Sequence, residues 1–240
     1  MPTLSVVIPA YHEERFIATL IDRIRQVDLA PLGFDRELIV VDDGSRDRTA
    51  EIVAQFHDVQ LTRKPNGGKG SAVRAGIAVA TGDYVMIQDA DLEYDPRDYI
   101  PMLQAVVSGR SRVVYGSRYL EHPGRGVWRN LMTGTHPEQS LAAYVGGQSL
   151  SFVALVFTGR YLTDTVTALK LFPRPQLVEL ELQSPGFELD HEITAKVLAR
   201  CWSIPEVPIR YYPRSRAEGK KIGLRDWFRA IRTFFRWRNG

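Results

Sequence analysis

The sequence predicts an α/β domain in which a mostly parallel, doubly wound central sheet is flanked by helices. Apolar runs of strand length alternate with amphipathic stretches of about 12 residues, the pattern of such sheets. The apolar runs end in polar residues at PAY, DDGS and QDAD. A length of 240 residues, with 44% hydrophobic and 25% charged residues, suits one globular domain with a full core.

The first two strand–helix pairs have the clearest patterns. LSVVIPA (4–10) is a short apolar run and predicts a strand. Residues 15–27 predict a helix, because their apolar side chains recur at helical spacing: Phe16, Ile17, Leu20, Ile21, Ile24 and Val27. ELIVVDDGS (37–45) predicts a buried strand that ends in acids and a glycine turn, and residues 47–56 predict the next helix.

The following segments continue the alternation. QLTRKPN (60–66) predicts a third strand, residues 68–80 a third helix, and DYVMIQD (83–89) a fourth strand. Ligands of parallel sheets bind beyond the carboxyl ends of the strands. We therefore expect PAY, DDGS and QDAD to converge on one crevice.

The stretch QDADLEYDP (88–96) gathers like charge directly after an apolar run. Side chains alternate in an extended strand, so Asp89, Asp91 and Glu93 would point the same way if the strand continued. Carboxylates at this spacing repel one another unless a cation lies between them, and their oxygens suit Mg2+ or Mn2+. The stretch therefore predicts a divalent metal site.

Two neighbouring motifs have a structural and a functional interpretation. Asp42 and Asp43 could form a turn that caps a helix, and VVDD also resembles the acidic pair of a response-regulator receiver domain, although a receiver would be shorter. NGGKGSA (66–72) could be a flexible turn. Its amides and Lys69 could instead approach a phosphate at a helix N-terminus, but it lacks the P-loop pattern.

Charge and cysteine content narrow the class further. The formal net charge is +3 and arginines become denser toward the C-terminus, which suggests an anionic partner. A single cysteine, Cys201, excludes an internal disulfide and favours the cytosol. The N-terminus lacks the basic and long apolar regions of a signal peptide.

Taken together, the motifs resemble a known family. VVIPAYHEE, VVDDGSRDRTAEI and KPNGGKGSAVRAGIAVATGDYVMIQDADLEYDP, in this order, resemble the N-terminal half of family 2 glycosyltransferases, which have the Rossmann-like GT-A fold. VVYGSRYL (113–120), LTDTVTALKLF (162–172), FELDHEITAKV (187–197) and IPEVPIRYYPRSRAEGKKI (204–222) resemble the polyprenyl-phosphate sugar synthases typified by dolichyl-phosphate mannose synthase. The resemblance covers nearly the whole chain.

The resemblance implies roles for individual residues. The implied nucleotide-sugar-binding residues are Pro9, Tyr11, Glu13, Asp42, Asp43, Lys69, Asp89, Ala90 and Asp91. The implied metal ligands are Asp89, Asp91 and Glu93, and the implied catalytic set is Asp89, Asp91, Arg118, Arg214 and Lys221. The three basic residues would face the donor diphosphate or the acceptor phosphate. The chain departs from the family at His12, where Asn is usual, and at Ala168–Leu169.

The chemistry that the resemblance implies is an inverting transfer of sugar to a dolichyl or undecaprenyl phosphate. The expected donor is of the GDP-mannose or UDP-glucose type, and no nucleic acid is expected. A lipid phosphate is already an anion and needs little help from a general base. A saccharide hydroxyl acceptor would need one. Glu188 and Asp190 could act as a base or position the sugar hydroxyls, and capping of the helix that starts near His191 is the alternative for both. A non-catalytic nucleotide-sugar-binding protein is the third hypothesis.

Two segments bear on a membrane. Residues 141–162 contain glycines and polar residues, so we expect a partly buried or interfacial helix rather than a spanning one. We divide the chain into a domain at 1–222 and a basic amphipathic helix at 223–240. That helix places Trp227, Phe228, Ile231, Phe234 and Phe235 opposite arginines, which suits peripheral attachment to the cytoplasmic face of an anionic membrane. Packing on the body of the protein, or in a homodimer, is the alternative.

Overall fold

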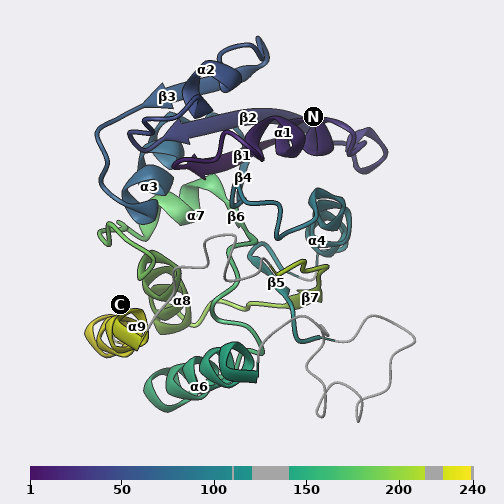
Figure 1. Cartoon of the computed structure of the whole chain (residues 1–240). Helices are drawn as coiled ribbons and strands as arrows, with labels where there is room; N and C mark the ends of the chain where they lie inside the picture. The colour runs from purple at the N-terminus through teal and green to yellow at the C-terminus, as the bar shows by residue number, and fades with distance from the viewer. Residues whose placement is uncertain (110, 121–140, 214–223, 239–240) are drawn as a thin grey trace.

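The computed structural model describes residues 1–109, 111–120, 141–213 and 224–238 of the chain (Figure 1). Within these residues the strands form one seven-stranded sheet in the order β3-β2-β1-β4-β6-β5-β7. The strands are β1 (Thr3–Ala10), β2 (Asp35–Asp42), β3 (Val59–Arg63), β4 (Tyr84–Ile87), β5 (Val114–Ser117), β6 (Lys170–Pro173) and β7 (Glu206–Pro208). Strands β1 to β4 are parallel, whereas β6 runs antiparallel to β4 and β5. The predicted mostly parallel sheet is confirmed.

Helices cover both faces of this sheet (Figure 1). They are α1 (Ile17–Arg25), α2 (Thr49–Val53), α3 (Lys69–Val79), α4 (Tyr99–Val107), α6 (Leu141–Thr158), α7 (Arg174–Glu179), α8 (Leu189–Ala199) and α9 (Leu224–Trp237), with short 3-10 turns η1 (Ala30–Leu32) and η2 (Pro96–Asp98). The helices expected within residues 15–27, 47–56, 68–80 and 141–162 and in the C-terminal segment all form.

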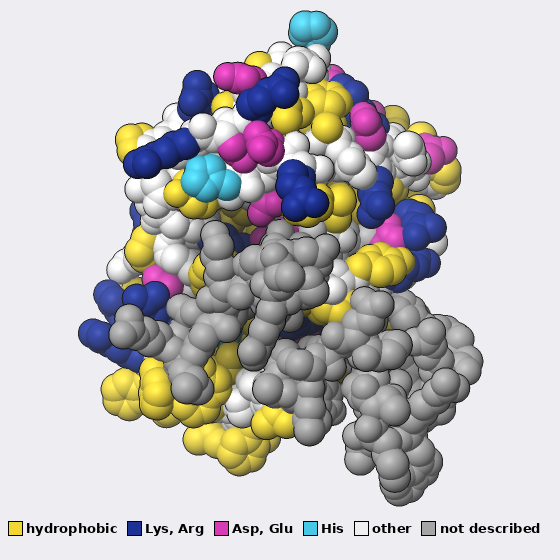
Figure 2. Space-filling model, in the orientation of Figure 1, with side chains coloured by type: hydrophobic (Ala, Val, Ile, Leu, Met, Phe, Trp, Pro, Cys, Tyr) yellow, Lys and Arg dark blue, Asp and Glu magenta, His cyan; other side chains and the backbone are white. Residues whose placement is uncertain are grey.

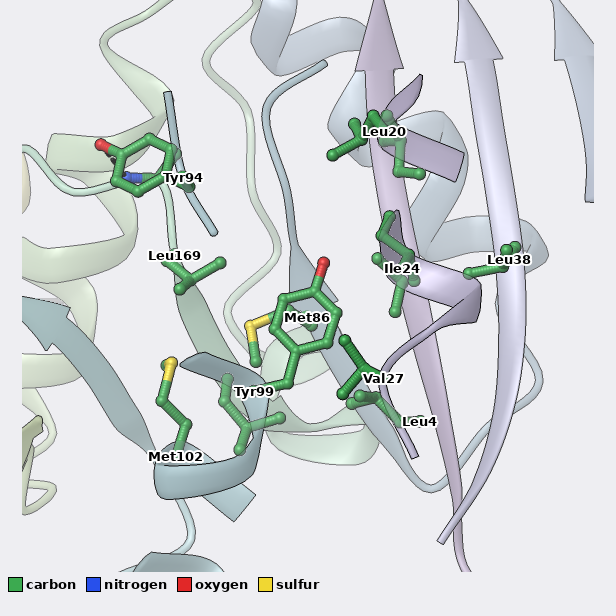
Figure 3. Close-up of a cluster of buried hydrophobic side chains, with 14 of the residues drawn as sticks. Leu4, Leu20, Ile24, Val27, Leu38, Met86, Tyr94, Tyr99, Met102 and Leu169 are labelled. Carbon is green, nitrogen blue, oxygen red and sulfur yellow. Dashed lines mark hydrogen bonds between the residues drawn. The ribbon is translucent and has the colours of Figure 1, made fainter. Parts of the chain in front are cut away.

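The core divides at the sheet because successive strand residues point to opposite faces. On one face, side chains of β1, β2 and β4 meet α1 and α4; Figure 3 shows Leu4, Leu38, Met86, Leu20, Ile24, Tyr99 and Met102 gathered there. On the other face, the alternate residues of the same strands pack against α3, α7 and α8. The chain is therefore a three-layer α/β domain, as expected.

The fourth strand is shorter than predicted. Strand β4 ends at Ile87, two residues before Asp89, and the side chain of the next residue, Gln88, is held from two sides. Its side-chain amide donates to the Asp89 carbonyl oxygen (3.0 Å) and its side-chain oxygen accepts from the Tyr99 hydroxyl (2.9 Å). The strand alternation that would have pointed three acids the same way therefore does not apply.

Candidate functional site

The carboxyl ends of β1, β2 and β4 meet, as the sequence predicts. The Asp43 amide donates to the Ala10 carbonyl oxygen (2.9 Å), and the Gln88 amide donates to the Val7 carbonyl oxygen (3.0 Å). The His12 amide donates to the Ser45 hydroxyl (3.0 Å). These bonds place PAY, DDGS and QDAD along one edge of the sheet.

At the end of β1, two rings form an exposed stack. Tyr11 is 40% exposed, and its ring centroid lies 4.0 Å from that of His12. His12 reaches this position through a left-handed backbone conformation, with φ of +57°. Pro9 pairs with Val41 in the sheet, and the Glu13 amide donates to the Thr49 hydroxyl (2.9 Å). The segment thus offers an aromatic surface on which a planar base could stack.

The acidic pair after β2 holds two loops. Asp42 is fully buried and accepts hydrogen bonds from the Ser45 amide (3.0 Å) and the Arg63 guanidinium (3.3 Å). Asp43 accepts from the amide of Gly68 (2.7 Å), as well as from the Gly67 amide and the Lys64 ammonium. Both acids thus hold turns, but the helix-capping part of the interpretation is wrong, because neither α2 nor α3 has a side-chain hydrogen bond at its N-cap. Nucleotide binding by Asp42 and Asp43 stays a prediction.

Several amides of the glycine-rich segment hold neighbouring loops. Two of them donate to Asp43, and the Ser71 amide donates to the Pro185 carbonyl oxygen (2.8 Å). The contact is close, because a Cβ on Gly70 would lie 2.4 Å from the Ser184 carbonyl oxygen. Phosphate binding at the N-terminus of α3 stays a prediction. The segment also contributes Lys69.

Lys69 meets the acidic stretch directly. Its ammonium lies 2.7 Å and 3.0 Å from the two carboxylate oxygens of Asp89, whose side chain is 22% exposed. Asp91 is half-buried, and one of its oxygens accepts from the Glu93 amide (3.1 Å). Leu92 between them has a φ of +62°, so the chain reverses there. Asp89 therefore already faces a cation.

Glu93 is directed elsewhere than predicted. Its carboxylate accepts a hydrogen bond from the Tyr211 hydroxyl (2.7 Å), and its carbonyl oxygen accepts from the Tyr212 amide (2.8 Å). Among the described residues, no three His, Cys, Asp or Glu side chains come together as a metal-binding group. The three-carboxylate site is not assembled in this arrangement, because the turn after β4 sends Glu93 toward Tyr211.

The remaining acids nevertheless fit a divalent cation. Asp89 and Asp91 offer hard carboxylate oxygens, and the ammonium beside Asp89 shows that this position attracts positive charge. Mg2+ in particular is usually held by one or two carboxylates, with phosphate oxygens and water completing the shell. Asp89 and Asp91 would hold such an ion.

Asp190 is tied to two lysines and makes a poor general base. One oxygen lies 3.2 Å from the Lys69 ammonium and the other 2.8 Å from the Lys170 ammonium. Burial raises the pKa of Asp190, but the two lysines outweigh it and lower the pKa to about 2. Glu188 accepts from the Gly186 amide (3.1 Å) and so fixes the loop before α8. Asp190 therefore does not fit the role of proton acceptor at neutral pH, and neither acid caps α8, which has no side-chain cap. Positioning of the sugar hydroxyls by Glu188 or Asp190 stays a prediction.

Arg118 is held by Asp164, a residue for which the sequence predicts no role. Its guanidinium forms two hydrogen bonds, of 2.7 Å and 2.8 Å, to fully buried Asp164, and lies 4.9 Å from the centre of the Tyr211 ring. Asp164 stands in LTDTVTALKLF, but nothing in its spacing signals this distant partner. The phosphate-binding role of Arg118 stays a prediction, and Arg214 and Lys221 lie outside the described residues.

Comparison with known proteins decides the family. The sequence profile described as glycosyl transferase family 2 matches residues 5–161, more than half of the chain. The chain belongs to glycosyl transferase family 2.

Relatives of this family 2 glycosyltransferase include three curated enzymes. It is 32% identical over 232 residues to the low-salt glycan biosynthesis hexosyltransferase of Haloferax volcanii, covering 96% of this chain and 52% of that protein. It is 30% identical over 243 residues to the dolichol-phosphate mannosyltransferase of Pyrococcus furiosus, covering 98% and 64%. The chain thus spans only part of these two relatives. The UDP-N-acetylglucosamine–dolichyl-phosphate N-acetylglucosaminyltransferase of Methanococcus voltae is 25% identical, with 95% and 94% covered.

Solved structures confirm the fold. Glucosyl-3-phosphoglycerate synthase from Mycobacterium tuberculosis in complex with UDP is 22% identical with a TM-score of 0.68, covering 99% of this chain and 80% of that one. Its complex with Mn2+, UDP-glucose and phosphoglyceric acid is 21% identical with a TM-score of 0.67 and the same coverage. At these identities the likeness establishes the GT-A type fold.

Proposed function

We propose that this family 2 glycosyltransferase moves a sugar from a nucleoside diphosphate sugar to a polyprenyl phosphate, with Mg2+ or Mn2+ and inversion at the anomeric carbon. One observation carries the proposal. Asp89 lies where the carboxyl ends of β1, β2 and β4 meet, and it is already paired with an ammonium. A position that attracts a cation thus lies beside the strand ends where a sheet of this kind binds its ligand.

The donor would lie along the strand ends. The exposed Tyr11–His12 stack suits the base, and the Asp42–Asp43 turn lies beside it. When bound at Asp89 and Asp91, the divalent cation would stabilise the negative charge that develops on the leaving diphosphate. The relatives named for UDP-N-acetylglucosamine and for mannosyl transfer support a nucleotide-sugar donor. We retain both GDP-mannose and UDP-glucose types.

The state of Asp190 favours one class of acceptor. A phosphate monoester is an anion at neutral pH, so it can attack the sugar without first losing a proton to the protein. A saccharide hydroxyl needs a general base, and a carboxyl group with a pKa of about 2 is a weak one. Two relatives act on dolichyl phosphate by name. Both considerations favour the lipid phosphate, with Arg118, Arg214 and Lys221 as its proposed contacts.

A surface for the lipid lies on α6 and α9. Figure 2 shows hydrophobic side chains gathered over these helices, with basic side chains beside them. Exposed apolar residues come from both helices: Val145, Phe152 and Val156 from α6, and Phe228 and Phe235 from α9. Arg229, Arg232 and Arg236 are exposed on α9. We infer that this face, termed the α6–α9 face, rests on the cytoplasmic side of an anionic bilayer.

The α6–α9 face differs from the single helical face that the sequence predicts. Phe234 is fully buried against α6 and α8, with its ring 5.4 Å from that of His191, and the Trp227 indole donates to the Ser149 hydroxyl (2.8 Å). The alternative interpretation, packing on the body, therefore applies to part of α9. No helix in the described ranges is long and apolar enough to cross a membrane.

Asp91→Asn tests the proposed reaction. The amide keeps the oxygen that accepts from the Glu93 amide, so the fold should survive, but loss of a carboxylate ligand should cost several kcal/mol, or about 100-fold or more in transfer. Nucleoside diphosphate release is measured under three conditions: in the presence of polyprenyl phosphate, in the presence of a saccharide, and without an acceptor. Asp22→Asn, on the exposed surface of α1, is the control variant.

Each outcome decides between functions. Release that needs polyprenyl phosphate and is lost in Asp91→Asn supports the proposal. Release that needs a saccharide identifies a glycan-extending enzyme, and nucleotide binding without release identifies a binding protein. Full activity of Asp91→Asn would contradict the metal assignment.

A further inference from the structure

Four charged side chains alternate in sign across the site. Asp89 contacts the Lys69 ammonium at 2.7 Å, Lys69 contacts Asp190 at 3.2 Å, and Asp190 contacts Lys170 at 2.8 Å. They come from the turn after β4, the first turns of α3 and α8, and β6. Their formal charges sum to zero, so the acids at the sheet edge are balanced by the chain's own cations.

The four groups become more buried along this row. The side chain of Asp89 is 22% exposed, that of Lys69 11%, that of Asp190 8%, and that of Lys170 0%. Lys170 also donates to the Thr167 carbonyl oxygen and lies 5.3 Å from the centre of the Tyr115 ring. Asp190 is therefore anchored from the inside, and Lys69 is the link between this anchor and the more exposed acid.

Lys69 lies between two carboxylates, those of Asp89 and Asp190. A divalent cation that approaches Asp89 thus meets an ammonium bound to both carboxylate oxygens. The two cations cannot share the same oxygens without strong repulsion.

We propose that Lys69 is a built-in cation that competes with the divalent metal for Asp89, and that Asp190 is a positioning residue that retains the ammonium when the metal replaces it. The inference rests on the proposed function, because the metal at Asp89 belongs to that function. The new element is the exchange at Asp89 of the Lys69 ammonium for the divalent metal.

Asp190 makes the exchange feasible. An ammonium displaced from Asp89 with no second partner would be a mostly buried, uncompensated charge, which is strongly unfavourable. Asp190 already lies 3.2 Å from it, and Lys170 keeps Asp190 in place. Binding of the metal in the absence of donor should therefore be weak but measurable, since Lys69 gives up one of two partners.

The first test measures Mn2+ binding to the full chain without nucleotide, by electron paramagnetic resonance of the free ion. Lys69→Met should bind Mn2+ on the order of tenfold more tightly than wild type, because the competitor is gone. Lys69→Arg keeps the charge and should stay close to wild type. Lys64→Met is the matched control, since it removes a lysine of the same loop that pairs with Asp43 instead of Asp89.

The second test isolates Asp190. Asp190→Asn alone would leave Lys170 buried without its carboxylate, so the comparison is made in a Lys170→Met background. There, Asp190→Asn should weaken Mn2+ binding on the order of tenfold, and Asp190→Glu should restore much of it. With Lys69→Met added, the effect of Asp190→Asn should shrink to less than about threefold, because no ammonium needs a second partner.

The outcomes separate this inference from the proposed reaction. If wild type and Lys69→Met bind Mn2+ equally, or if Lys64→Met binds as tightly as Lys69→Met, competition by Lys69 is wrong while the metal site stands. If Asp190→Asn has the same effect with and without Lys69, Asp190 acts only as a nearby charge and its positioning role is wrong. If neither wild type nor Lys69→Met binds Mn2+, the metal assignment and the inference both fail.

Discussion

Arg118 and Asp164 form a charged pair inside the protein rather than on its surface. The side chain of Arg118 is 9% exposed and that of Asp164 is 0% exposed. Burial alone would lower the pKa of Arg118, but the Asp164 carboxylate has the larger effect, so the pKa is raised above its ordinary value. Removing one member of such a pair destabilises the protein by more than the intact pair stabilises it, because the other charge stays buried without a partner carboxylate or cation. The pair therefore fixes where the guanidinium can reach.

Asp164→Asn should destabilise the protein by about 3 kcal/mol or more, since the Arg118 guanidinium loses this carboxylate. Urea denaturation followed by circular dichroism measures the loss. Glu51→Gln is the matched control, because it breaks an exposed ion pair in which the side chains of Arg48 and Glu51 are 71% and 74% exposed. This change should lower the free energy of unfolding by less than about 1 kcal/mol. Similar, small losses for both variants would mean that Arg118 does not depend on Asp164.

Residue roles were predictable where the signal was local. The spacing of acids in QDAD and the lysine in NGGKGSA indicate a charged site, and the structure brings Asp89 and Lys69 together. Contacts with Asp164, Lys170 and Tyr211 were not predictable, because each joins segments that are distant along the chain. The course of the chain after Ile87 was also missed, since the side chains that contact this segment, Tyr99 and Tyr211, follow it in the sequence and carry no local signal.

Among the elements, α3 packs closely against one face of the sheet. Gly76 faces β1 and β2, and a Cβ added there would lie 2.3 Å from Val7 Cγ1 and 3.2 Å from Val41 Cγ2. Both valines are fully buried. Gly146 in α6 contrasts with it, because no described atom lies within 4 Å of such a Cβ.

Gly76→Ala and Gly146→Ala should therefore change stability in opposite directions. At Gly76 the overpacking of two buried valines should cost about 1–3 kcal/mol, more than the gain in helix propensity. At Gly146 there is no overpacking, so the higher helix propensity of alanine should stabilise the protein by about 0.5–1 kcal/mol. Urea denaturation of both variants checks this, and a stabilised Gly76→Ala would show that α3 can shift away from the sheet.

Helices α8 and α9 meet at a buried histidine. His191 packs against Phe234, and burial lowers its pKa from 6.5 to about 4. Because the pKa is lower in the folded state, the unfolded state binds more protons between these values. The free energy of unfolding is therefore unaffected by the titration of His191 above about pH 6.5 and decreases as the pH falls toward 4.

Wild type should accordingly lose about 2 kcal/mol of unfolding free energy between pH 7 and pH 5 through His191. His191→Phe keeps an aromatic ring beside Phe234 and cannot titrate, so its loss over the same interval should be smaller by about that amount. Urea denaturation at the two pH values measures the difference. Equal losses would mean that His191 is solvated enough to protonate while folded.

At the level of elements, the sequence predicted the first half of the chain better than the second. Strands β1, β2 and β4 are apolar runs bounded by turn residues, so periodicity located them within a few residues. Strand β4 has only four residues but is the apolar run YVMI, whereas β5 (VYGS), β6 (KLFP) and β7 (EVP) mix apolar residues with Gly, Ser, Lys, Glu or Pro. Such mixed segments carry little pattern, and the antiparallel course of β6 arises from tertiary pairing with β4 and β5.

The whole molecule separates a polar edge from an apolar face. The Asp89–Lys69 site lies at the carboxyl ends of β1, β2 and β4, whereas the α6–α9 face exposes Phe152 and Phe228, which are 62% and 65% exposed. Exposed aromatic side chains from two helices, with arginines beside them, form a larger surface than either helix offers alone. This arrangement predicts that α6 contributes to membrane attachment as much as α9 does.

Phe152→Ser tests α6 and Phe228→Ser tests α9. Each change should weaken binding to anionic vesicles by about tenfold, because burial of a phenylalanine side chain contributes about 1.5–3 kcal/mol when complete. Val107→Ser on α4, which lies away from α9 in Figure 1, removes a residue that is 59% exposed and should leave binding unchanged. Vesicle flotation measures the binding, and urea denaturation should show little change because all three side chains are exposed.

The same variants separate attachment from chemistry. Phe152→Ser with Phe228→Ser should slow transfer to a long-chain polyprenyl phosphate in vesicles, while transfer to a short, water-soluble isoprenyl phosphate should persist, because the Asp89–Lys69 site is built by other elements. Unchanged flotation of Phe152→Ser would restrict the contact to α9. Equal loss with both acceptors would mean that the α6–α9 face supports the active site itself, and attachment to the bilayer would then have to come from another part of the chain.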